Sequence, residues 1–150
     1  MQAQDPSYEQ RTRDSFARQP AMVTLGASLE SVAPGRVVLV MPHRDALTQQ
    51  HGFLHAGVLS AALDSACGYA AFSLMPADAA VLTIEFKVNL LAPARGPLFR
   101  FEGTVIKPGR TISVVEARAT QHSPDGADSK LVATMTATIM TVQGREGLHH

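Results

Sequence analysis

One stretch constrains the fold of this chain more than any other, the run QQHGFLHAGVLSAALDSACGYAAFSL from Gln49 to Leu74. A loop with His and Gly leads into a segment made mostly of Ala, Gly, Ser and Leu. This composition predicts one long helix from about His55 to Leu74. A single acid, Asp64, lies in the middle of the segment, and burying an unpaired carboxylate is costly. Asp64 must therefore reach solvent, find a partner or take part in chemistry.

The remaining chain predicts a short helix and then mostly strands. A polar helix is expected over Tyr8–Gln19, ended by Pro20. Runs of β-branched or alternating residues between turn signals predict the strands. These runs are Met22–Ala33, Arg36–Met41, Val81–Leu91, Leu98–Ile106, Thr111–Gln121 and Lys130–Val142. Such a meander predicts an α+β fold, with one antiparallel sheet of five or six strands covered by the long helix.

The run Val81–Leu91 alternates throughout its length. Its odd-numbered residues, Thr83 among them, are expected on one face, and its even-numbered residues from Leu82 to Leu90 on the other. The odd face carries the polar residues and the even face is apolar.

Composition narrows the function classes. The chain of 150 residues is expected to be a single domain, and 45% hydrophobic against 17% charged residues argues against disorder. A formal net charge of zero and the lack of Trp disfavour a nucleic-acid partner. The polar start MQAQDPSYEQ is unlike a signal peptide, and Asp64 interrupts the longest apolar run, so no membrane span is expected. The single cysteine, Cys67, permits no internal disulfide, which suggests a cytoplasmic protein.

The spacing between Asp64 and the helix start suggests a site shared by two chains. Asp64 lies nine residues after His55, which is about 13 Å along a helix axis. The free N–H groups and the positive dipole end at the helix start would hold an anionic intermediate. If both features belong to one site, two helices must lie side by side and antiparallel, which requires at least a homodimer. The alternative is a structural Asp64 that is exposed or hydrogen-bonded.

The residues Gln49, His55-Ala56-Gly57 and Asp64, followed by VLTIEFKVNLLAPARG, resemble the hotdog-fold acyl-CoA thioesterases of the phenylacetate-degradation (PaaI-like) family. In that family an Asn or Gln precedes His-Gly-Gly, and an Asp or Glu stands eight residues after the first Gly. The resemblance covers roughly residues 20–142. It implies one hotdog domain, in which a curved antiparallel sheet wraps a central helix, and hydrolysis of an acyl-CoA thioester.

The resemblance also implies roles for single residues. Asp64 matches the catalytic carboxylate, as general base or nucleophile, and the backbone N–H of Ala56 matches the oxyanion donor. His55 matches the residue that supports this loop, and Gln49 the amide that positions the carbonyl or the water. Thr83 aligns with a Ser or Thr that helps to hold the water from the facing subunit. A pre-aimed N–H and a carboxylate suit thioester hydrolysis, and no metal or cofactor is required because coenzyme A is part of the substrate.

Two departures from the family pattern concern the acyl group. Ala56 stands where most members have Gly, and Gln49 where the nearer branch has Asn. Both leave the choice between an aryl and a medium-chain acyl group open.

A second set of residues is implied for coenzyme A. The turn Lys107-Pro108-Gly109-Arg110 resembles a region that contacts the phosphates, and Gly57 belongs to the same substrate-binding set. Weaker candidates for this role are Arg95 and Lys130. An exposed hairpin with ordinary surface charges would explain the turn equally well.

Other interpretations of these residues are less favoured. His51 and His55 have the spacing of zinc ligands, but Gly52 stands where a zinc peptidase has its Glu, so no metal site is expected. Cys67 is expected to serve packing.

Rival functions are a non-catalytic acyl-CoA-binding hotdog module and a hotdog dehydratase or hydratase. The family also commonly pairs dimers into homotetramers.

Overall fold

The computed structural model describes residues 1–148. His149 and His150, which are either native or the remnant of a purification tag, lie outside the described residues. The described residues form three α-helices, one short 3-10 helix and six strands. In order these are α1 (Tyr8–Ala17), α2 (Pro20–Leu25), β1 (Ser28–Ala33), β2 (Arg36–Pro42), η1 (Asp45–Leu47), α3 (Ala56–Phe72), β3 (Ala80–Leu90), β4 (Leu98–Lys107), β5 (Ile112–His122) and β6 (Ser129–Val142).

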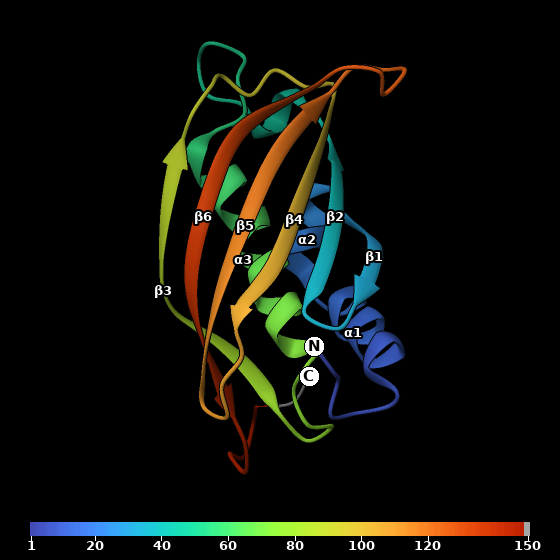
Figure 1. The fold of residues 1–150 in the computed structure, drawn as a ribbon. Coiled ribbons are helices and arrows are strands. Elements are labelled where there is room, and N and C mark those ends of the chain that lie inside the picture. The colour runs from blue at the N-terminus through green and yellow to red at the C-terminus, as the bar shows by residue number, and fades with distance from the viewer. Residues whose placement is uncertain (149–150) are drawn as a thin grey trace.

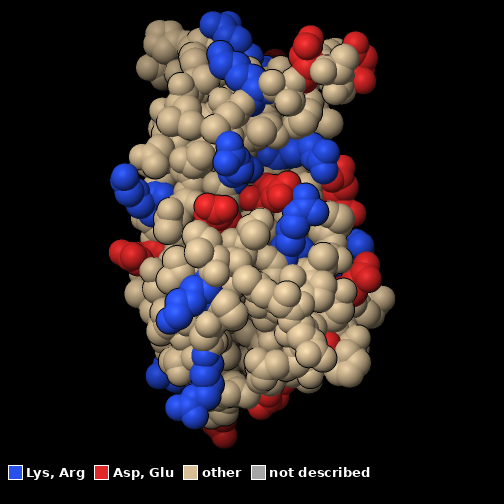
Figure 2. Space-filling view, in the orientation of Figure 1, with Lys and Arg blue, Asp and Glu red and all other residues tan. Residues whose placement is uncertain are grey.

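The six strands make one antiparallel sheet in the order β1-β2-β4-β5-β6-β3, which curves around α3 (Figure 1). The predicted α+β arrangement of a sheet wrapped around one long helix is therefore confirmed. β3 directly follows the helix, yet it lies at the sheet edge beside β6, the last strand. The core fills the space between α3 and the concave face of the sheet. On the opposite face Lys and Arg side chains are interspersed with Asp and Glu (Figure 2). Arg36 of β2 pairs with Glu102 of β4 at 2.7 Å.

Close packing of α3 on the sheet depends on small residues on both sides. Ala62, Ala66 and Ala70 of the helix are fully buried. Opposite them, β4 carries Gly103, where an added Cβ would lie 2.3 Å from the backbone oxygen of Ala66. Any larger residue at Gly103 would push the helix away from the sheet, because backbone cannot move aside as a side chain can.

The predicted strand over Met22–Ala33 is wrong in its first half, where α2 forms instead. Pro20 is at the start of this helix, where its fixed φ suits the helix and its missing N–H costs nothing. Gly26, with φ of 71°, ends the helix in the left-handed conformation. The strand begins only at Ser28.

The predicted alternation of β3 is also wrong at one point, because a bulge interrupts the strand. β3 pairs through Thr83 with Ile139 and next through Glu85 with Thr138, so Ile84 is the extra residue. Before the bulge Thr83 shares the inner face with buried Ile139; after it, Phe86 shares that face with buried Ala137. The bulge therefore turns a polar residue of the first half and apolar residues of the second half toward the helix.

The C-terminal end of α3 is closed by Arg11 of α1. Its guanidinium donates hydrogen bonds to the backbone oxygens of Phe72, Met75 and Pro76, at 3.2, 2.8 and 3.0 Å. It also pairs with Asp5 at 2.8 Å. Phe72 is the last residue of the helix and Met75 and Pro76 follow it, so the cation lies at the C-terminal end, where the helix dipole favours positive charge. Within residues 1–148, none of the helices has both the length and the apolar character needed to cross a membrane.

Candidate active site

The start of α3 is an open helix end with a free donor. His55 precedes the helix in an extended conformation, and its Nδ1 accepts a hydrogen bond from the N–H of Gly57 at 2.9 Å. Gly57 suits this cap because a Cβ there would lie 3.1 Å from Nδ1. Among the described residues no acceptor engages the N–H of Ala56, the first residue of the helix. This N–H is thus available to a ligand oxygen.

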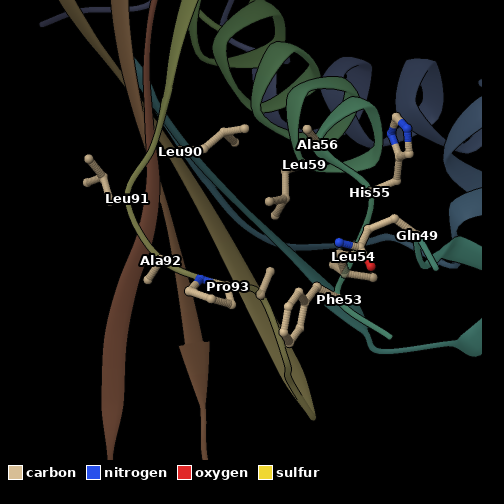
Figure 3. Close-up of a pocket in the computed structure, with 11 residues that line it drawn as sticks. Gln49, Phe53, Leu54, His55, Ala56, Leu59, Leu90, Leu91, Ala92 and Pro93 are labelled. Carbon is tan, nitrogen blue, oxygen red and sulfur yellow. The ribbon is translucent and has the colours of Figure 1, made fainter. Parts of the chain in front are cut away.

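A cavity of about 480 Å³ lies at this helix start. The helix start, the preceding loop and the end of β3 surround it (Figure 3). Its lining is mostly apolar, and Gln49, His55 and Ala56 all contribute to it. The Oε1 of Gln49 accepts a hydrogen bond from the N–H of His51, which fixes the amide while its nitrogen keeps its donors for a ligand. Gln49, His55 and Ala56 are thus brought together.

Asp64 lines a separate cavity of about 280 Å³ in the middle of α3. Its Oδ1 accepts a hydrogen bond from the hydroxyl of Thr83 at 2.7 Å, so these two predicted residues also meet. Burial raises the pKa of Asp64 above its ordinary value of 3.8, and the Thr83 hydroxyl opposes this shift. A half-buried carboxylate with a raised pKa and a hydroxyl partner in a cavity is typical of a catalytic base.

The two groups of residues are not brought together within one chain. Asp64 stands eight residues after Ala56 on the same helix, which is about 12 Å along the axis. The cavities that they line share no residue. Each chain thus carries one group of candidate residues at the start of α3 and the other group in the middle of α3.

The predicted coenzyme A turn lies at the far end of α3. Gly109 and Arg110 line a third cavity, of about 540 Å³, together with Leu74 and Met75. The turn requires glycine at position 109, because a Cβ there would lie 1.9 Å from the backbone oxygen of Ile112. Lys107, at the end of β4, is exposed. The sequence alone could not show whether Gly109 is needed for the shape of the turn or for binding coenzyme A.

Two further residues near the site have contacts that the sequence did not indicate. Arg95, only a weaker candidate, stacks its guanidinium 4.4 Å from the ring centre of Phe53, which lines the cavity at the helix start. Gln121 of β5 was missed. Its Oε1 accepts hydrogen bonds from the N–H groups of Arg95 and Gly96, at 2.9 and 3.3 Å, and so fixes this loop. Cys67 is buried, and burial raises the pKa of its thiol, as expected of a packing residue.

Known proteins resemble the chain in both sequence and structure. The profile of the Thioesterase superfamily matches residues 51–126, so the chain belongs to this superfamily. A crystal structure of a thioesterase family protein from Silicibacter pomeroyi is 60% identical and covers 91% of this chain and 99% of its own, with a TM-score of 0.88. The PaaI protein of the E. coli phenylacetic acid degradation operon is 19% identical over 90% of this chain and 93% of its own, with a TM-score of 0.79, and shows the same hotdog fold.

Sequence relatives include a protein of Saccharolobus solfataricus named "Putative esterase SSO2140". It is 37% identical over 93 residues, which are 61% of this chain. The chain spans 65% of the length of that relative. The matched residues 51–126 of the superfamily profile contain the helix start, Asp64 and Thr83.

Proposed function

We propose that this protein is an acyl-CoA thioesterase whose active site is shared between two copies of the chain. The observation that carries the proposal is the pairing of Asp64 with Thr83 in one cavity, while the free N–H of Ala56 lies in another. Thioester hydrolysis needs a base for water and a donor for the developing oxyanion. Membership of the Thioesterase superfamily supports the reaction class.

Two arrangements of the proposed reaction are open, and both use the same groups. With Asp64 as general base, its carboxylate takes a proton from water while the water oxygen adds to the thioester carbon. The carbonyl oxygen becomes negative and accepts a hydrogen bond from Ala56 of the second copy. Collapse of this intermediate breaks the C–S bond, and the departing thiolate takes the proton from Asp64. With Asp64 as nucleophile, its carboxylate adds to the thioester carbon and expels the thiolate, which leaves an acyl-carboxylate anhydride. Water then hydrolyses this anhydride to the free acid and the Asp64 carboxylate, and the proton that water releases goes to the thiolate.

The uncovered edge strand β3 is a surface on which a second copy of the chain could pair. β3 is an edge strand of the sheet, and five apolar residues of this strand and of the position after it are 43–54% exposed in the single chain. They are Leu82, Ile84, Phe86, Leu90 and Leu91. An apolar edge strand invites pairing with another chain. A two-fold pairing of β3 would put two α3 helices side by side and antiparallel, with Asp64 of one beside Ala56 of the other. Pairing of two such dimers into a homotetramer is part of the proposal.

Cations stand on both sides of the proposed substrate path. Arg95 belongs to the copy that supplies Ala56, beside the cavity at the helix start. In the antiparallel pair, the far end of the other copy's α3 extends about 12 Å beyond that helix start. Its Lys107 and Arg110 would then flank the same mouth, where the phosphates of coenzyme A would lie. The single cysteine suits a reducing compartment, so we place this activity in the cytoplasm.

Mixing two inactive variants tests the shared site directly. Asp64→Asn removes the base and keeps the shape of the side chain. Ala56→Pro removes the donor N–H, and proline is well accepted at the first position of a helix after an extended residue such as His55. Each variant alone should lose nearly all hydrolysis of acyl-CoA. Co-refolding equal amounts should restore about a quarter of wild-type activity, because half of the dimers are mixed and each holds one intact site.

The outcomes separate the rival explanations. No restoration on mixing, with dimers formed, would contradict the shared site. An Asp64→Asn variant with full turnover would contradict Asp64 as the catalytic group. Binding of acyl-CoA by the wild type without hydrolysis, across aryl and straight-chain substrates, would favour the alternative of a non-catalytic binding module.

A further inference from the structure

The cavity beside Asp64 has a glycine in its wall that the fold does not require. Gly68 follows Asp64 by four residues, so both lie on the same face of α3, and both line this cavity. Gly68 has no positive φ and is buried. A Cβ built on it would nonetheless meet no atom of the described residues within 4 Å, apart from its chain neighbours and the nearby backbone of its own helix. Glycine weakens a helix interior relative to alanine, so this residue is costly where it stands.

Other glycines of the described chain have clear reasons. At Gly103 and Gly109 a Cβ would collide with backbone oxygens, at 2.3 and 1.9 Å. At Gly57 it would crowd the capping ring of His55, at 3.1 Å. The remaining described glycines outside α3 all have a positive φ. Gly68 differs from them because its missing side chain leaves only empty volume, and that volume is the cavity.

The walls of the cavity are held in place, so the empty volume does not close. Tyr69 makes edge contacts with Phe16 and Phe72, at 5.5 and 6.1 Å between ring centres, and its hydroxyl lies 3.3 Å from that of Ser15. Gln19, between α1 and α2, closes another side, and its Oε1 accepts a hydrogen bond from Ser65 at 3.4 Å. With fixed walls, the atoms missing at Gly68 set how far a ligand can enter.

The lining indicates which part of a substrate fits. Val81, Leu82 and Tyr69 supply apolar walls, and Asp64 is the one charged side chain among the described lining residues. A volume of about 280 Å³ is at the low end of small-molecule pockets, too small for a whole acyl-CoA but suited to its acyl part. The cavity at the helix start has the cationic Arg95 beside it and suits the coenzyme instead.

We infer that the cavity beside Asp64 receives the acyl group of the thioester and that Gly68 determines the length of acyl group accepted. This inference rests on the proposed thioesterase function. It makes Gly68 a specificity-determining residue, since added atoms at this position would occupy the inner end of the acyl site.

Substitution of Gly68 across a substrate series tests the inference. The wild type, Gly68→Ala and Gly68→Val are assayed with acetyl-, butyryl-, octanoyl- and phenylacetyl-CoA. For Gly68→Val, kcat/KM for octanoyl- and phenylacetyl-CoA should fall about tenfold or more relative to acetyl-CoA, with Gly68→Ala in between. Gly68→Ala should also raise the Tm, because alanine favours the helix. Val58→Ile is the matched control, because it adds one methyl group to the same helix outside the cavity.

The outcomes separate this inference from the function on which it rests. A wild type that hydrolyses none of the four thioesters overturns the proposed function and this inference with it. A wild type that is active, with variants whose ratio of octanoyl to acetyl turnover stays within about twofold of the wild type, overturns the acyl assignment alone. A wild type that accepts only acetyl-CoA also overturns it. A narrowed profile in the more stable Gly68→Ala excludes misfolding as the cause.

Discussion

The two ends of α3 are treated in opposite ways. At the C-terminal end, Arg11 donates to three backbone oxygens, and the Ser73 hydroxyl donates to the oxygen of Ala70 and accepts from the N–H of Gly35. At the N-terminal end, His55 caps Gly57, and no acceptor within residues 1–148 engages the N–H of Ala56, which lies beside a cavity. Helix ends normally find partners for such groups. The closed end therefore stabilises the fold, and the open end leaves the N–H that the proposed reaction would use as its oxyanion donor.

This difference predicts that substitutions at the open end affect turnover and those at the closed end affect stability. The largest effect is expected at Ala56. Ala56→Pro should lower kcat by about 10²–10³-fold, the usual cost of one lost oxyanion donor. Its free energy of unfolding should change little, because proline suits the first helical position. Steady-state kinetics and chemical denaturation measure both quantities.

Two variants at the same position control for shape. Ala56→Gly keeps the N–H and removes the methyl group, and Ala56→Val keeps the N–H and adds bulk. Both should retain much more activity than Ala56→Pro. If Ala56→Val loses as much activity as Ala56→Pro, crowding rather than the missing N–H explains the effect.

The closed end should show the reverse pattern. Arg11→Met should lower the free energy of unfolding by about 2–3 kcal/mol, since a cation with several buried partners is lost. The kcat of the protein that remains folded should not change. Urea denaturation measures the loss. Arg13→Met on the same helix is the control, because its exposed pair with Glu9 should contribute about 0.5 kcal/mol or less. Equal losses in the two variants would show that Arg11 does not close the helix.

A smaller effect is expected at His55, which connects both roles. His55→Ala removes the acceptor for the N–H of Gly57 and should cost about 1 kcal/mol, as the loss of a helix cap does. It should also lower kcat, with KM nearly unchanged, because the cap holds the Ala56 N–H in position. His55→Asn provides an acceptor again and should recover both quantities. Recovery of stability without recovery of kcat would point to a more direct role for the imidazole.

The sequence predicted the open end far better than the closed one. The run of small residues is a local signal for the helix, and the alternating runs between turns are local signals for the sheet. The shared site that the lone acid and its spacing from Ala56 suggest stays a prediction. The Arg11 cap joins residues more than 60 positions apart, and no local pattern marks such a contact. The α2 helix did carry a signal, since Pro20 and Gly26 bracket it, but the alternation of the following residues favoured a strand.

The bulge in β3 was the other hidden feature, and it matters for the site. Strict alternation put Thr83 on the face opposite to Phe86 and Leu90. The extra residue at Ile84 lets all three face inward, so that Thr83 reaches Asp64 while the apolar half of β3 lines the same side. A single-residue bulge changes the face of every later residue, and sequence periodicity alone does not locate it.

The contact between Thr83 and Asp64 leads to the smallest predicted effect, which is a shift in pH dependence. Burial raises the pKa of Asp64, so the acidic limb of kcat/KM should lie above the ordinary carboxyl value of 3.8. The Thr83 hydroxyl stabilises the carboxylate and opposes this shift. Thr83→Val should therefore move the acidic limb to higher pH, while Thr83→Ser should leave it in place. Superimposable pH profiles for Thr83→Val and the wild type would contradict the assignment.

The pH dependence of the free energy of unfolding should also reflect the raised pKa of Asp64. Because the pKa of Asp64 is higher in the folded chain than in the unfolded one, protonation favours the folded state. The contribution of Asp64 to stability is fully present below 3.8 and is lost as the pH rises through its folded pKa. Asp64→Asn cannot titrate, so it should become more stable relative to the wild type as the pH rises through that range. In the Thr83→Val background, the difference in stability between Asp64→Asn and its parent should keep growing to a higher pH. Equal shifts of the acidic limb of kcat/KM and of the stability curve would then show that both depend on the Asp64 carboxylate.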